Sequence, residues 1–161
     1  MRKLVVWTVM LIMAAGILAS CSLTRELSPE GLVSDKEAGA VAMEYMQLMQ
    51  KYFKKIMSKD FESKAVNSAL LRYLSDDYFD SRNIDKHDLT VNAYYVRDFT
   101  IVDYEAPFVR IEMRDPRHRW AKEITFKIVR EDGNAVIMPP DQEIENHVNP
   151  WWDVKSKPYH E

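Results

Sequence analysis

The sequence predicts an α+β fold, with N-terminal helices packed on a curved antiparallel β-sheet. Two observations lead to this prediction. Residues 35–57 place apolar side chains at spacings of three and four, which is the period of an amphipathic helix. Beyond Lys86, apolar and polar residues alternate in several short runs, which is typical of strands with one covered face. Helices followed by a run of strands are the element order of an α+β domain.

The first predicted helix covers residues 35–57. Ser34 and Glu37 have the spacing of a capping box, and Asp35 suits the positive end of the helix dipole. The apolar face consists of Ala42, Tyr45, Met46, Met49, Tyr52, Phe53 and Ile56. Methionines on such a face can line an adaptable pocket for an apolar ligand, but the same spacing also suits a core that packs against the sheet.

Two shorter helices are expected within residues 58–83. Ala65, Ala69, Leu70 and Leu74 share one face of the first of them. Ser75 precedes two aspartates, which is typical of an N-cap. The sequence DDYFD should therefore form a short turn of helix.

Strands are expected between residues 90 and 138. The predicted inward positions are Val109, Ile111 and Met113 in one strand and Ile124, Phe126 and Ile128 in the next. The sequence EDGN predicts a tight hairpin because Gly133 accepts a positive φ. The last predicted strand, AVIM, ends at Pro139, which cannot donate a hydrogen bond to a sheet.

Residues 139–161 have no sustained period and are interpreted as a C-terminal tail after a domain at 34–138. Trp151 and Trp152 are expected to pin part of this tail onto the domain, because two tryptophans left in water are unusual. They are equally suited to anchor a partner, since tryptophan is enriched in binding hot spots.

The N-terminus has the layout of a secretory signal peptide. Arg2 and Lys3 precede a mostly apolar, uncharged stretch at residues 4–18, and small residues follow. The stretch is shorter than the roughly twenty residues that a membrane-spanning helix needs. Residues 1–20 are therefore predicted to be a cleaved signal peptide.

The sequence LASC at residues 18–21 resembles the lipobox of bacterial lipoproteins, and it holds the only cysteine of the chain. The resemblance implies that Cys21 carries a diacylglycerol thioether and, after cleavage, a further acyl chain such as palmitate on its amine. Residues 21–33 would then be the lipidated cysteine and a tether. Ser22 in place of aspartate implies the outer membrane, facing the periplasm. The alternative is an ordinary signal peptide with a cysteine nearby.

The composition limits which classes of partner and cofactor are expected. Removal of residues 1–20 lowers the basic count from 22 to 20 and leaves 25 acidic residues, so the net charge becomes −5. A nucleic-acid-binding domain is normally basic, so no nucleic-acid partner is expected. The four histidines lack metal-ligand spacing, and the sequence has no glycine-rich phosphate loop, so neither a metal nor a cofactor is expected.

Basic residues gather on one predicted hairpin of this acidic chain. Arg114, Arg117, Arg119 and Lys122 are the candidate residues, with Arg110 and His118 beside them. Such a cluster suits an anionic contact: a phospholipid headgroup, a lipopolysaccharide or an acidic partner. The alternative is a solvated hairpin edge whose charges discourage aggregation.

The element order of residues 35–138, with the sequence YLSDDYFD between helix and strands, resembles the nuclear transport factor two-like superfamily, a cone of curved sheet wrapped on helices. Cystatin-like sheets around a helix are the structural alternative. The superfamily resemblance implies either a non-catalytic module or an enzyme with Asp, His or Tyr inside the cone. Asp98, Asp103, Tyr94, Tyr95 and Tyr104 lie in or near the strands, but none of them is assigned a catalytic role.

The expected function is that of a lipid-anchored envelope lipoprotein. It would act as a non-catalytic binding or assembly module for a partner protein or a small apolar ligand. One alternative is an enzyme whose cone-shaped pocket uses Asp or Tyr for acid–base chemistry. Another is a structural accessory of an envelope complex.

Overall fold

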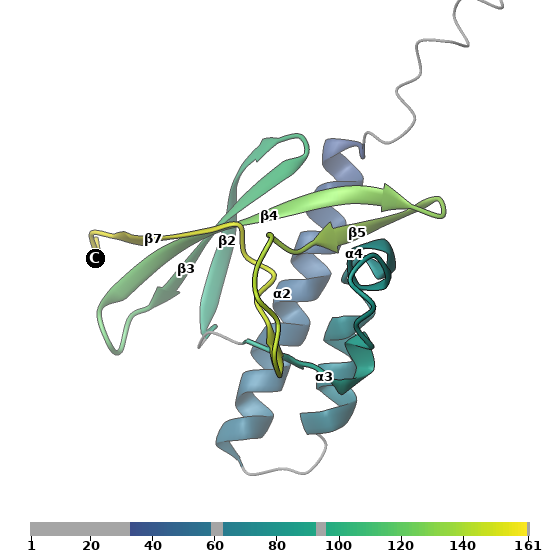
Figure 1. Ribbon diagram of the computed structural model, residues 1–161. Coiled ribbons are helices and arrows are strands. Elements are labelled where there is room, and N and C mark those ends of the chain that lie inside the picture. Colours follow the sequence, from purple (N-terminus) through teal and green to yellow (C-terminus); the bar gives the residue numbers. More distant parts are fainter. Residues whose placement is uncertain (1–32, 59–62, 93–95, 161) are drawn as a thin grey trace, which may run out of the picture. The chain divides into compact units, whose positions relative to one another are not determined.

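The computed structural model describes residues 33–58, 63–92 and 96–160. Several predicted features lie outside the described residues: the signal peptide, Cys21, nearly all of the tether, and the pair Tyr94 and Tyr95. The described chain has the predicted α+β fold, with one long helix and a mostly antiparallel five-stranded sheet (Figure 1).

Two of the helices, at Asp35–Met57 and Asp76–Asp80, begin where the capping residues Ser34 and Ser75 predict. α2 (Asp35–Met57) starts after Ser34, whose Oγ accepts a hydrogen bond of 3.3 Å from the Glu37 amide. α3 (Ser63–Leu71) and α4 (Asp76–Asp80) follow, with Ser75 as the N-cap of α4. A single 3-10 turn, η1 (Lys86–Asp88), leads into the strands. None of the helices in the described part of the chain is long and apolar enough to cross a membrane.

Four strands form an antiparallel meander. They are β2 (Asp98–Glu105), β3 (Phe108–Asp115), β4 (Trp120–Glu131) and β5 (Asn134–Met138). Asp132 and Gly133 have φ angles of 48° and 81°, so the β4–β5 hairpin has the positive-φ turn that its sequence predicts. The register pairs Val109 with Phe126 and Ile111 with Ile124, which places all four on one face.

The C-terminal residues contain two strands that the sequence analysis did not predict. β6 (His147–Val148) pairs in parallel with β1 (Thr90–Val91), and β7 (Asp153–Lys157) pairs with the first half of β4 (Figure 1). The interpretation of residues 139–161 as a tail therefore omits part of the sheet. The sequence DVKSK of β7 has one apolar residue, so an apolar–polar alternation could not reveal it.

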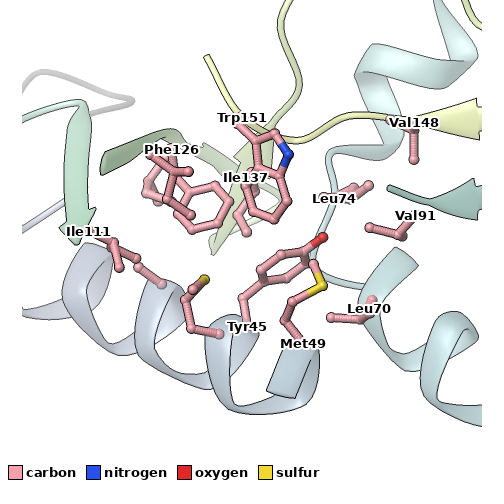
Figure 2. Packing of buried hydrophobic residues seen from close by; sticks show 14 of the residues in the cluster. Tyr45, Met49, Leu70, Leu74, Val91, Ile111, Phe126, Ile137, Val148 and Trp151 are labelled. Atoms are coloured by element: carbon pink, nitrogen blue, oxygen red, sulfur yellow. The ribbon is translucent and has the colours of Figure 1, made fainter. Parts of the chain in front are cut away.

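The core lies between α2 and the face of the sheet that we call the inner face. Tyr45 of α2 meets Phe126 of β4 edge to face, with ring centroids 5.3 Å apart, and Trp151 packs on Phe126 at 5.4 Å (Figure 2). Met46 and Met49 are fully buried in the same cluster. Their side chains therefore serve as core, which is one of the two roles that their spacing allows. All residues of this core cluster lie between positions 33 and 154. The chain from Ser22 onward therefore contains the whole core, and we expect it to fold by itself.

Candidate functional site

The face of the sheet opposite to α2, here called the outer face, carries most of the charged side chains of the strands. Because side chains alternate along a strand, the residues between the core positions point to this face. The register sets Arg110 beside Thr125 and Glu112 beside Glu123, and β7 adds Lys155 opposite Glu123. The sheet thus has an apolar inner face and a charged outer face.

Charges on the outer face are paired with one another. Arg110 forms an ion pair with Asp103, and Lys157 forms one with Glu123. The hydrogen bond from Arg110 lowers the pKa of Asp103, and the hydrogen bond to Glu123 raises the pKa of Lys157. Both shifts favour the charged forms of Asp103 and Lys157.

Two aromatic side chains interrupt this charged face; we call Phe108 and Trp152 the aromatic platform. Their ring centroids are 5.9 Å apart in an edge-to-face arrangement, and the Lys127 ammonium lies 5.0 Å from the Trp152 ring. The Trp152 Nε1 donates a hydrogen bond of 2.7 Å to the Met138 carbonyl. Trp152 nevertheless stays 37% exposed. The platform is therefore both fixed in place and accessible.

The two neighbouring tryptophans have different roles. Trp151 is 2% exposed and belongs to the core beside Phe126 (Figure 2). Trp151 therefore pins the C-terminal residues onto the domain, which is one of the two roles expected for the pair, and its buried ring cannot also contact a partner. Only Trp152 of the predicted pair offers a surface.

The turn between β3 and β4 carries two of the four predicted basic residues, Arg117 and Arg119. We call Arg117, His118 and Arg119 the basic tip. Arg114 lies on the outer face and is ion-paired with Glu112. Lys122 lies across from Met113 on the inner face, with its ammonium 5.9 Å from the Trp120 ring. The four predicted residues therefore do not form one patch: two of them are in the turn, and the other two flank it on opposite faces.

Asp115 holds the tip in shape. Its side chain is fully buried, and its carboxylate accepts hydrogen bonds from the amides of Arg117 (2.9 Å) and His118 (3.2 Å) and lies 2.7 Å from His118 Nδ1. Burial by itself raises the pKa of Asp115, but the hydrogen bonds from His118 and from the Arg117 amide outweigh burial and hold that pKa below its ordinary value. The carboxylate is therefore ionised wherever the domain is folded near neutral pH.

The lowered pKa predicts a pH-dependent stability. A carboxyl group with a lowered folded pKa stabilises the fold above its unfolded pKa, and this stabilisation is lost as the pH falls through the folded value. We expect Asp115→Asn to be less stable than the native chain at pH 7, and we expect the gap to begin to narrow as the pH falls below about 4, the unfolded pKa of an aspartate. Urea midpoints measured from pH 7 to pH 3 check this. A gap that stays constant with pH would mean that the charge of Asp115 does not contribute.

Among the described residues, Asp98, Asp103 and Tyr104 of the enzyme alternative do not converge on a pocket. Asp103 is paired with Arg110 on the outer face, Asp98 is exposed, and Tyr104 is 43% exposed where its ring lies over Gly39. A cleft of about 580 Å³ lies instead between α4 and η1 and has Asp76, Asp80, Asp85 and His87 among its lining residues. Within the described residues, no group of three or more His, Cys, Asp and Glu could hold a metal ion.

Sequence reasoning missed two residues that shape these surfaces. Asp115 followed by Pro116 is a turn-initiating pair, so the role of Asp115 had a local signal. Phe108 had no such signal, because its contact with Trp152 joins the start of β3 to a residue outside the predicted strands.

No protein-family model, no curated protein and no solved structure matches the chain.

Proposed function

We propose that the protein is a bacterial lipoprotein that is anchored through Cys21 and binds a protein partner of the cell envelope without catalysing a reaction. The signal-peptide layout and the sequence LASC support the anchor. The aromatic platform supports the binding function, and the accessible, immobilised Trp152 is the observation that carries it. The domain would face the periplasm from the outer membrane.

The platform has the properties of a binding hot spot. Tryptophan is over-represented among the residues that dominate interface energies, and such residues usually sit inside a ring of polar contacts that excludes water. Trp152 has the charged strands of the outer face around it. Because its ring is already held by Met138 and Phe108, partner binding would cost little additional side-chain entropy.

Packing of the core favours a protein partner over a small apolar ligand. The fully buried side chains of Tyr45, Met46 and Met49 are packed within the core cluster.

The partner should present an apolar side chain to the Phe108–Trp152 pair. An acidic group close to Lys127 would complement the ammonium that lies beside the Trp152 ring.

A photoreactive amino acid placed beside the platform tests this function. Glu105 is exposed and lies opposite Phe108 in the register, so a benzoylphenylalanine at position 105 leaves both platform rings intact. Position 51, exposed on α2, is the matched control. In intact cells we expect one adduct of defined mass from position 105 and none from position 51.

The platform itself is tested by adding Trp152→Ala to the position-105 variant. We expect the adduct to decrease at least tenfold, because removal of a hot-spot side chain typically costs 2 kcal/mol or more. A thermal melt of Trp152→Ala must show a folded domain, since the substitution also removes the hydrogen bond to Met138. An adduct that forms equally with and without Trp152 would exclude the platform as the binding surface.

A further inference from the structure

We propose that the basic tip, at the turn between β3 and β4, binds the anionic headgroup surface of the membrane that carries the lipid anchor. This inference rests on the anchor of the proposed function, but it is independent of the aromatic platform and of any protein partner. It gives the domain a second, electrostatic contact with the membrane and thereby an orientation on it.

The tip presents its cations on a fixed backbone. Arg117 and Arg119 are exposed at the turn, while the buried Asp115 carboxylate accepts the amides of Arg117 and His118. Arg119 has a φ of 50°, a conformation that the surrounding turn must impose on a residue with a side chain. A turn held in this way keeps the two guanidinium groups at the end of the hairpin, where they can reach a flat surface.

Charge is distributed unevenly between the two ends of the domain. Residues 114–122 hold four basic residues and one acidic residue, a net charge of +3. Residues 76–88, around α4 and η1, hold five acidic and two basic residues, a net charge of −3. An anionic surface attracts the first segment and repels the second, so the distribution favours one orientation of the domain rather than mere adhesion.

Trp120 adds an amphipathic side chain next to the tip. It is half-buried at the start of β4, and the Lys122 ammonium lies 5.9 Å from its ring. Tryptophan is enriched at the level of lipid headgroups, where an apolar ring with a polar edge fits both environments. This end of the hairpin thus holds a tryptophan, a lysine and two arginines. Basic residues attract anionic lipids, so the combination suits a charged lipid surface.

The length of the tether allows the tip to reach the membrane that holds the anchor. The start of α2 lies at the far end of β4, because Glu37 forms an ion pair of 2.8 Å with Arg130. The ten steps along β4 from Trp120 to Arg130 span roughly 33 Å at about 3.3 Å per step. The twelve residues from Ser22 to Val33 can extend to about 40 Å. The tether can therefore span the length of β4, so the tip can contact the headgroups while the end of β4 that carries α4, where the Asp76 amide donates to Glu131, points away from the membrane.

Vesicle co-sedimentation of the chain from Ser22 onward, without the lipid, tests the inference. Vesicles with about a third of phosphatidylglycerol are compared with pure phosphatidylcholine at about 0.1 M salt, where the Debye length is about 10 Å. Each basic residue close to an anionic surface strengthens binding about fivefold. We expect Arg117→Glu combined with Arg119→Asp to weaken binding to the anionic vesicles at least 20-fold; Asp is chosen at position 119 because it tolerates a positive φ.

Lys51→Glu combined with Lys54→Glu is the matched control. It changes the net charge by the same amount on exposed positions of α2, and it should leave binding within about twofold of native, since exposed charges farther than a Debye length from the lipid are screened. If the turn variant is poorly folded, Arg117→Gln alone should still weaken binding about fivefold.

Three results would overturn the inference: equal binding to neutral vesicles, equal weakening by the two double variants, or displacement from the vesicles by inorganic phosphate at constant ionic strength. The last would assign the tip to isolated phosphate groups instead of a lipid surface. Because the protein in this experiment lacks Cys21, its outcome is separate from that of the anchor. A chain that is never lipidated in cells could still bind vesicles, and an anchored chain could fail to do so.

Discussion

Phe126→Asp is expected to leave the domain unfolded at room temperature. Phe126 is fully buried and touches the rings of Tyr45 and Trp151, so it joins α2, β4 and the segment before β7. Truncation of a buried phenylalanine costs about 3–5 kcal/mol, which includes the lost burial of the ring and the cavity left behind. An unpaired carboxylate at the same position adds several kcal/mol more. The free energy of unfolding of a domain is only about 5–15 kcal/mol, so the two losses together remove most or all of this stability.

Circular dichroism and a thermal melt of the chain from Ser22 onward check this expectation. Thr125→Asp is the matched control, because Thr125 is the preceding residue and faces Arg110 on the outer side of the sheet. We expect the control to melt cooperatively. A normal melting curve for Phe126→Asp would show that the inner and outer faces of β4 are assigned the wrong way round.

Cys21→Ser is expected to abolish lipidation and signal-peptide cleavage at this site. A thiolate is the nucleophile that forms the thioether, and the serine hydroxyl that would replace it is far less reactive at neutral pH. Stable attachment to a bilayer takes at least two acyl chains, so a variant without them should no longer be held by lipid. Labelling with a radioactive fatty acid and the mass of the protein on a gel measure both effects. Acyl label that persists in the variant would refute the anchor.

Ser22→Asp provides the matched control for the anchor. Resemblance to lipoproteins of two-membrane bacteria implies that an aspartate directly after the lipidated cysteine keeps the protein in the inner membrane. We therefore expect this variant to carry the acyl label like the native chain and to move to the inner-membrane fraction in a sucrose gradient. If native and variant proteins fractionate together, the assignment to the outer membrane is wrong even where the lipid is present.

The elements that are visible in the sequence are those whose signals are local. Ser34 and Glu37 start α2 through contacts three residues apart, and Gly133 closes the β4–β5 hairpin through its own backbone conformation. Val109 and Phe126 reveal the inner face because side chains alternate along every strand. The basic residues around the β3–β4 turn can likewise be counted without coordinates.

Contacts between distant segments are what the sequence does not show. β7 is mostly polar, and it is a strand only because β4 offers it an open edge beside β5. Trp152 gains its place from Phe108 and Met138, and Asp115 is buried only because the turn folds over it. None of these partners lies at a spacing that a helical or strand period would reveal.

The sequence by itself determined the α+β order, the helix starts, the inner face of the sheet and the expectation of a lipid anchor at Cys21. Only the tertiary structure decided which tryptophan is core and which is surface, and which of the four predicted cations stand together at the tip. The physical reason is that periodicity and capping depend on neighbours along the chain. Burial and charge pairing depend instead on neighbours in space, such as Phe126 beside Trp151 and Glu112 beside Arg114.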